Sequence, residues 1–236
     1  IFTPRRKAFK IILMKEIFNP ANFFEVKKNK IEKYWLGRVS YSEGLEIQNN
    51  KVQLRIEGEI NDQVLLLEHE PVYTIGRTKD HSSLPDEPAS LPHPLFITNR
   101  GGKATYHGPG QLIGYPILDL KNYKQDLHIY LRSIENSLVN TCLHYGIKAN
   151  TKDGLTGVWC NSRKIASIGV GVRQWVSMHG FAINVNGDLS PFNEITPCGI
   201  KDAEVTNIEK ETGSKVDLQE FSDHAFKYLS EELSKL

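Results

Sequence analysis

Side chains able to do nucleophilic chemistry are few in this sequence, and Cys198 has the most suggestive setting. It stands between Pro197 and Gly199, in a segment without an apolar stripe. The thiolate form of cysteine is a strong nucleophile, and a nearby cation lowers the pKa of a thiol. The pattern is compatible with a nucleophile aimed at a ligand or with an incidental free thiol, and the local sequence leaves both open.

A candidate base is Lys164, which begins the run Lys-Ile-Ala-Ser-Ile-Gly. A lysine entering such small, apolar surroundings would be partly desolvated, which favours the neutral amine and makes it usable as a base. A solvent-facing strand end is the alternative. Small residues in the neighbouring runs 167–169 and 180–182 would leave room for a narrow apolar slot.

The stretch 100–111, Arg-Gly-Gly-Lys-Ala-Thr-Tyr-His-Gly-Pro-Gly-Gln, organises the chain around these residues. Five of its twelve residues are Gly or Pro, which excludes a long helix. It lies between two apolar runs, 94–98 and 112–118, that are typical of strands. Two interpretations remain: a hairpin with a decorated turn, or bare backbone that approaches a ligand closely. Its spacing fits neither the dinucleotide fingerprint nor the P-loop.

The elements that must position these residues follow from periodicity. Helices are expected at 40–58, where Ser40 and Glu43 form a capping box, at 126–145, with Cys142 on the core stripe, and at 216–236. Strands are expected at 63–68, 72–75, 157–160, 164–172 and 176–185, the last three as successive antiparallel strands. The sequence therefore predicts a single α+β domain, with a mostly antiparallel sheet and helices covering one face.

Composition limits the function classes. The 236 residues carry a net charge of +1, so no global field holds nucleic acid. No apolar run is long enough for a membrane span. Three cysteines favour a reduced compartment, the cytoplasm, with an organelle matrix as the alternative because residues 1–15 are basic. No metal motif is present, and we expect no metal.

Several ordered motifs together resemble the lipoyl(octanoyl) transferase family. Besides the stretch 100–115, they are Tyr-Trp-Leu-Gly at 34–37, Glu-Pro-Val-Tyr-Thr-Ile-Gly-Arg at 70–77, Gly-Val-Trp at 157–159, Lys-Ile-Ala-Ser-Ile-Gly at 164–169, His-Gly-Phe-Ala-Ile-Asn at 179–184 and Pro-Cys-Gly-Ile at 197–200. The resemblance covers 34–207, so we expect a catalytic domain at 34–236 and an N-terminal extension at 1–33.

The resemblance implies the α/β fold of biotin- and lipoate-protein ligases, related to class II aminoacyl-tRNA synthetase cores. It also implies transfer of octanoyl from acyl carrier protein to a lysine of lipoyl domains, in 2-oxoacid dehydrogenase complexes and glycine cleavage H protein, without ATP or another cofactor. Cys198 would accept the acyl group and Lys164 would act as its base. The implied substrate-binding residues are Arg100, Gly101, Gly102, Lys103, Ala104, Thr105, Tyr106, His107, Ser167, Ile168, Gly169, Gly180, Phe181 and Ala182.

Three alternatives stay open. An ATP-dependent lipoate or biotin ligase would have the same fold but would need no nucleophilic cysteine. A cysteine hydrolase would use Cys198 with His107 and would release the acyl group to water. A non-catalytic binder of lipoyl domains would leave Cys198 without a role. The acidic carrier protein is expected to dock on a local basic patch made of Arg77, Lys103, Arg163 and Lys201.

Overall fold

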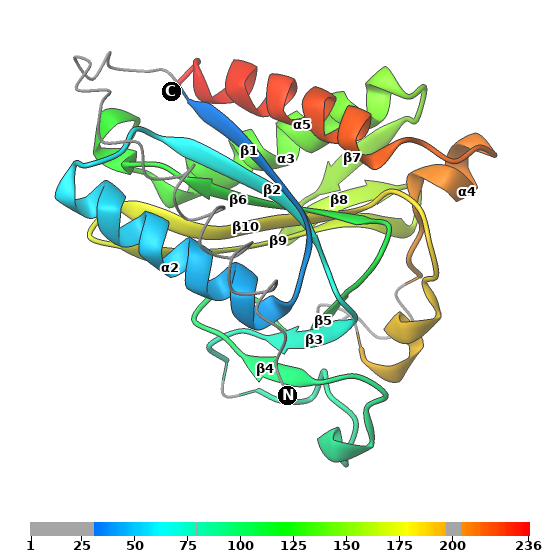
Figure 1. Ribbon diagram of the computed structural model, residues 1–236. Coiled ribbons are helices and arrows are strands. Elements are labelled where there is room, and N and C mark those ends of the chain that lie inside the picture. The colour runs from blue at the N-terminus through cyan, green and yellow to red at the C-terminus, as the bar shows by residue number, and fades with distance from the viewer. Residues whose placement is uncertain (1–30, 79, 197–203) are drawn as a thin grey trace, which may run out of the picture. The chain divides into compact units, whose positions relative to one another are not determined.

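The computed structural model describes residues 31–78, 80–196 and 204–236, which belong to one compact unit spanning Ile31–Leu236. A seven-stranded sheet forms its centre (Figure 1). In this sheet β1 and β2 run parallel, and the other neighbouring strands are antiparallel. In spatial order the strands are β1 (Glu32–Val39), β2 (Gln63–His69), β6 (Gln111–Ile117), β10 (Val176–Asn184), β9 (Arg163–Arg173), β8 (Leu155–Cys160) and β7 (Ala149–Lys152).

Helices cover both faces of this sheet, so the expectation of helices on one face is wrong (Figure 1). Helix α2 (Tyr41–Glu57) packs on one face, while α3 (Leu127–His144) and α5 (Leu218–Leu233) pack together on the other. Successive residues of a strand point to opposite faces. Accordingly, Leu65 belongs to the cluster beneath α2, and Leu66 belongs to the cluster beneath α3 and α5.

A second, three-stranded sheet carries the Gly-rich stretch and replaces the hairpin that one interpretation predicted. It contains β4 (Leu95–Ile97), β3 (Val72–Ile75) and β5 (Thr105–His107), in this spatial order. β3 pairs parallel with β4 and antiparallel with β5. The two flanking runs therefore enter different sheets, because β4 joins the small sheet and β6 joins the large one. The hairpin interpretation is wrong for that reason.

The expected helices and strands are otherwise present, with ends that match their capping residues. The Ser40 hydroxyl accepts a hydrogen bond from the Glu43 amide at 3.2 Å and so caps α2, and the Asp126 carboxylate caps α3. Such caps satisfy amides that have no partner within the helix. The elements not predicted from the sequence are β1 and the shorter β5, β7, α4 (Ile208–Thr212) and 3₁₀ turns Pro88–Ser90, Leu120–Asn122 and Ser190–Glu194.

Two features are absent from the part of the chain that the structure describes. It holds no helix of the length and apolar character that a bilayer crossing requires. It also holds no group of three or more His, Cys, Asp or Glu side chains that could bind a metal ion. The predicted division between residues 33 and 34 stays a prediction, and the described strand β1 begins at Glu32.

Candidate active site

A cavity of about 60 Å³ lies where α2, the Gly-rich stretch and strands β5, β6, β9 and β10 meet. Sequence analysis expected these segments to gather around a ligand, and most of the expected residues line this one cavity. Those that do are Arg100, Gly102, Lys103, Thr105, His107, Ser167, Ile168, Gly169, Gly180, Phe181 and Ala182. Their role in binding substrate stays a prediction.

Three residues expected at the site are not part of the cavity lining. The Gly101 amide donates to the Val170 carbonyl at 3.0 Å, and the Ala104 amide donates to the Ser83 hydroxyl at 3.0 Å. Tyr106 packs against Tyr73 and Phe192 in a separate apolar cluster. These contacts hold the Gly-rich stretch in place outside the cavity.

The Gly-rich stretch lies directly on strand β9 because Gly169 has no side chain. A Cβ atom at Gly169 would stand 2.8 Å from the carbonyl oxygen of Gly101. The Arg100 side chain then fixes the shape of the stretch, donating to the carbonyls of Gly101, Thr74 and Lys103 at 2.8, 2.8 and 3.0 Å. One wall of the cavity is thus backbone that a buried guanidinium holds rigid.

His107 is buried, and both of its ring nitrogens have partners. Nδ1 lies 2.7 Å from Oε1 of Gln111, and Nε2 lies 3.2 Å from Oγ1 of Thr74. Burial lowers the pKa of His107 to about 3, with the neighbouring His69 adding to the effect. A general base needs a free lone pair and a pKa near the working pH. These contacts argue against the alternative in which His107 activates a cysteine.

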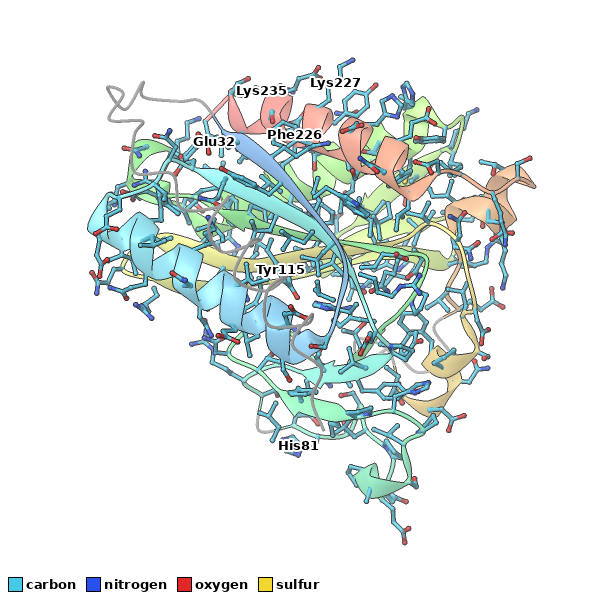
Figure 2. The ribbon with its side chains drawn as sticks, in the orientation of Figure 1. Glu32, His81, Tyr115, Phe226, Lys227 and Lys235 are labelled. Atoms are coloured by element: carbon cyan, nitrogen blue, oxygen red, sulfur yellow. The ribbon has the colours of Figure 1, made fainter. Side chains whose placement is uncertain are left out.

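Sequence analysis missed four residues that line the cavity: Tyr41, Ile113, Tyr115 and His179. Tyr115 lies in the interior of the molecule, whereas Lys227 and Lys235 lie along the periphery on and just beyond α5 (Figure 2). The Tyr115 hydroxyl is 2.7 Å from Nε2 of the buried His69. Ile113, Tyr115 and His179 belong to the quoted motifs, so the motifs offered a signal for them. Tyr41 lies outside these motifs, and its place on the apolar stripe of a helix indicated an ordinary core position.

His179 has an unusual backbone, with φ of 56° although it is not glycine. Its amide donates to the side-chain oxygen of Gln48 on α2, and its ring Nε2 contacts the side-chain oxygen of Asn99. Burial lowers the pKa of His179 to about 4, and the cationic Arg100 and Arg77 lower it further. Such strained positions persist only where the surroundings hold them, and they gather at functional sites.

Lys164 is buried with an exposed fraction of 3%, so the alternative of a solvent-facing strand end is wrong. Its Nζ donates to the Thr156 carbonyl at 3.1 Å and lies 4.9 Å from the centre of the Trp159 ring. Gly157 provides the room, since a Cβ there would stand 2.6 Å from Cε of Lys164. Lys164 lies three residues before Ser167, which lines the cavity on the same strand.

The three cysteines have different surroundings. Cys198 lies outside the described residues, so its role as nucleophile stays a prediction. Cys142 belongs to the core beneath α3 and α5, as expected, and burial raises the pKa of its thiol to about 12. Cys160 is buried, and its thiol donates to the Glu211 carboxylate at 3.1 Å.

The cations expected to receive an acidic carrier protein are partly neutralised. Nζ of Lys103 lies 2.6 Å from the Asp80 carboxylate, and Arg163 lies 2.8 Å from the Glu211 carboxylate. Arg77 is exposed, and Lys201 lies outside the described residues. Among the described cations, Lys103 and Arg163 therefore offer less free positive charge than the sequence suggested.

Comparison with known proteins places this chain among catalytic domains of one family. Residues 40–230 match the family described as lipoyl protein ligase A/B catalytic domain. The octanoyltransferase of Clostridium kluyveri is 48% identical over 179 residues, covering 75% of this chain and 77% of that protein. The octanoyltransferase of Geobacter sulfurreducens is 46% identical over 185 residues, covering 78% and 77%.

Solved structures with low sequence identity share the fold. A putative lipoate protein ligase from Thermoplasma acidophilum with bound lipoic acid matches with a TM-score of 0.66 at 16% identity, covering 87% of this chain and 86% of that one. Biotin protein ligase from Aquifex aeolicus matches with a TM-score of 0.52 at 17% identity, covering 87% and 70%. The fold is thus of the biotin- and lipoate-protein ligase type, as expected. With its motifs, fold and sequence similarity in agreement, the chain belongs to the octanoyltransferase family.

Proposed function

We propose that this protein is an acyltransferase that moves an octanoyl group from octanoyl-acyl carrier protein to a lysine of a lipoyl domain, as the start of protein lipoylation. The close relatives named octanoyltransferase support this activity. The observation that supports roles for particular residues is the cavity, because residues from several separate motifs of the family pattern line it together.

The proposed chemistry needs no ATP, because the donor is a thioester and is already activated. The Cys198 thiol gives its proton to Lys164, and its sulfur attacks the acyl carbonyl. The carbon–sulfur bond to the carrier breaks, and the carrier thiolate takes the proton from Lys164. The acceptor lysine then attacks the enzyme thioester, its proton passes through Lys164, and the Cys198 thiolate leaves and is reprotonated. Each half is general acid–base work by one amine.

The surroundings of Lys164 suit this cycle. When the amine has received a proton, the Thr156 carbonyl accepts from it and the face of Trp159 attracts its charge. The cavity has apolar surfaces from Ile113, Ile168, Phe181 and Ala182. A straight acyl chain gains roughly 0.8 kcal/mol for each methylene it buries, so the depth of the slot would set the preferred chain length.

The decisive experiment looks for a covalent octanoyl group on Cys198. Purified enzyme mixed with octanoyl-acyl carrier protein, without ATP, is expected to gain the mass of one octanoyl group, and hydroxylamine is expected to remove it. Peptide mapping locates the adduct. Cys198→Ala should abolish it, whereas the matched variant Cys160→Ala should keep it.

The same experiment separates the alternatives. Adding a lipoyl domain should discharge the adduct onto a lysine of that domain faster than water does. Faster discharge to water would identify a hydrolase, and a strict need for ATP would identify a ligase. A persistent adduct in Cys198→Ala would rule out Cys198 as the acyl acceptor. Binding of a lipoyl domain without any transfer would identify a non-catalytic binder.

A further inference from the structure

A line of hydrogen bonds runs from the cavity to the segment around Thr206, which pairs with Lys164. Arg100 donates to Oγ1 of Thr74 at 2.9 Å, and Oγ1 of Thr74 lies 3.2 Å from Nε2 of His107. Nδ1 of His107 lies 2.7 Å from Oε1 of Gln111. Gln111 donates to Oδ1 of Asn184 at 2.8 Å. We call these five residues, Arg100, Thr74, His107, Gln111 and Asn184, the relay.

The direction of the relay is fixed by groups that have only one role. A guanidinium only donates, so Arg100 makes the Thr74 oxygen an acceptor at that contact. At the other end, Nδ2 of Asn184 donates at 3.0 Å to the carbonyl of Thr206, which only accepts. In the middle of the relay, Nε2 of Gln111 also donates to the Tyr106 carbonyl at 3.2 Å. This bond fixes which side of the Gln111 amide is the nitrogen and so excludes the flipped orientation.

This direction determines the tautomer of His107. Because Oε1 of Gln111 can only accept, Nδ1 of His107 must carry the hydrogen. Nε2 is then the acceptor, and the Thr74 hydroxyl donates to it. Arg100, Thr74, His107, Gln111 and Asn184 are all buried, so solvent offers no substitute for a lost partner. If any one of these residues exchanged its donor and acceptor roles, two acceptors or two donors would face each other.

The relay ends on the segment that holds the backbone of Lys164. The Lys164 amide donates to the Glu204 carbonyl at 2.8 Å, and the Thr206 amide donates to the Lys164 carbonyl at 2.9 Å. This parallel bridge pairs Lys164 with Val205. Asn184 thus donates to the carbonyl of Thr206, and the amide of Thr206 donates to the carbonyl of Lys164. At the other end of the relay, Arg100 fixes the Gly-rich wall of the cavity.

We propose that Gln111 and Asn184 are positioning residues, which keep the backbone of Lys164 in register with the acyl cavity through the relay. This inference rests on the proposed acyl transfer. Neither residue needs to touch the substrate, and Gln111 and Asn184 are not part of the cavity lining. Their loss should lower the rate of the chemical step more than it lowers binding, because small displacements of a catalytic group are costly.

The first test compares Asn184→Leu with Asn186→Leu. The side-chain amide of Asn186 also makes two hydrogen bonds, with the backbone amide and carbonyl of Val216, which lies just before α5. Both variants lose comparable bonds, so both should unfold at lower denaturant concentration. Only Asn184→Leu should lower kcat, by about 10-fold or more, with the KM for octanoyl-acyl carrier protein within about threefold of wild type. Equal kcat values for the two variants would overturn the proposal.

The second test examines direction. In Gln111→Glu, an ionised carboxylate would face the acceptors Tyr106 and Asn184, whereas a protonated one can donate again. Between pH 5 and 9 the kcat ratio of variant to wild type should therefore fall as pH rises, because protonation repairs the relay. A ratio independent of pH would contradict a directed relay.

A spectroscopic measurement is independent of activity. In ¹⁵N-labelled protein, the His107 ring should show the Nδ1–H tautomer, with its signal identified by its loss in His107→Phe. In Gln111→Leu the preference for this tautomer should weaken, since its acceptor is gone. An Nε2–H tautomer in the wild type would refute the relay. Failure of wild-type acyl transfer with the expected tautomer would instead refute the proposed function.

Discussion

Replacing Gly157 by alanine should displace Lys164 and slow acyl transfer strongly. The new Cβ would stand 2.6 Å from Cε of Lys164, 0.8 Å inside the 3.4 Å at which ordinary contact begins, and 2.7 Å from the Ala166 carbonyl oxygen. The residue also has φ of +142°, which a residue with a Cβ rarely adopts. We expect about 1–3 kcal/mol for this crowding and about 1–3 kcal/mol for the backbone.

The effect on rate follows from where the crowding acts. The Lys164 side chain must move away from Thr156 and Trp159, and misplacing a general base by about 1 Å costs on the order of 100-fold. The assay is kcat for transfer to a lipoyl domain, with the free energy of unfolding from urea titration. Gly154→Ala is the matched control, because Gly154 also has positive φ, +74°, but its Cβ would meet open space.

The two variants together isolate the steric effect on Lys164. Both should lose stability through backbone strain, yet Gly154→Ala should keep its rate within about threefold of wild type, because it leaves the geometry around Lys164 intact. A rate for Gly157→Ala close to that of Gly154→Ala would refute the reasoning that this glycine makes room for a catalytic amine.

Three further predictions concern charge and protonation. Lys164→Arg keeps the charge but cannot release a proton near neutral pH, so transfer should slow by at least about 100-fold, and near-normal turnover would exclude a base. Folded-state pKa values of about 3 for His107 and about 4 for His69 lie below the ordinary 6.5, so the unfolded chain binds more protons across that window. The free energy of unfolding should therefore be highest above pH 6.5 and fall as the pH drops toward 4. In urea titrations, His69→Asn should flatten this pH dependence, whereas His128→Asn, at an exposed position, should leave it unchanged. Asp80→Asn should release Lys103 and lower the KM for acyl carrier protein about two- to threefold at low salt, with no change for a small acyl thioester; an equal change for both donors would contradict docking at Lys103.

Local signals in the sequence predicted most elements of the central sheet and its helices. Helix α2 was predictable because Ser40 caps it and its apolar residues recur at helical spacing. Strands β8, β9 and β10 were predictable because turn residues separate extended apolar runs. The same holds for much of the cavity lining, because small residues and a Gly-rich stretch mark where backbone and ligand can come close.

Pairing between distant segments was beyond such signals. Strand β5 has three residues, and its existence depends on β3 rather than on its own pattern. The continuous run Val64–Leu67 could have corrected the expectation of one covered face, since a strand buried on both sides lacks alternation. The partners of His107 could not be predicted, because Thr74 and Gln111 reach it from different strands.

The interior position of β6 in the large sheet has a consequence for folding during synthesis. Its partner on one side, β2, precedes it in the chain, but its partner on the other side, β10, is made only after α3, β7, β8 and β9. A chain still on the ribosome therefore carries an open β6 edge until β10 emerges, and the cavity has no second wall before then. Contacts this distant in sequence slow folding and expose unpaired strands to aggregation. Truncation anywhere before β10 should thus yield aggregation-prone fragments rather than a partly active enzyme.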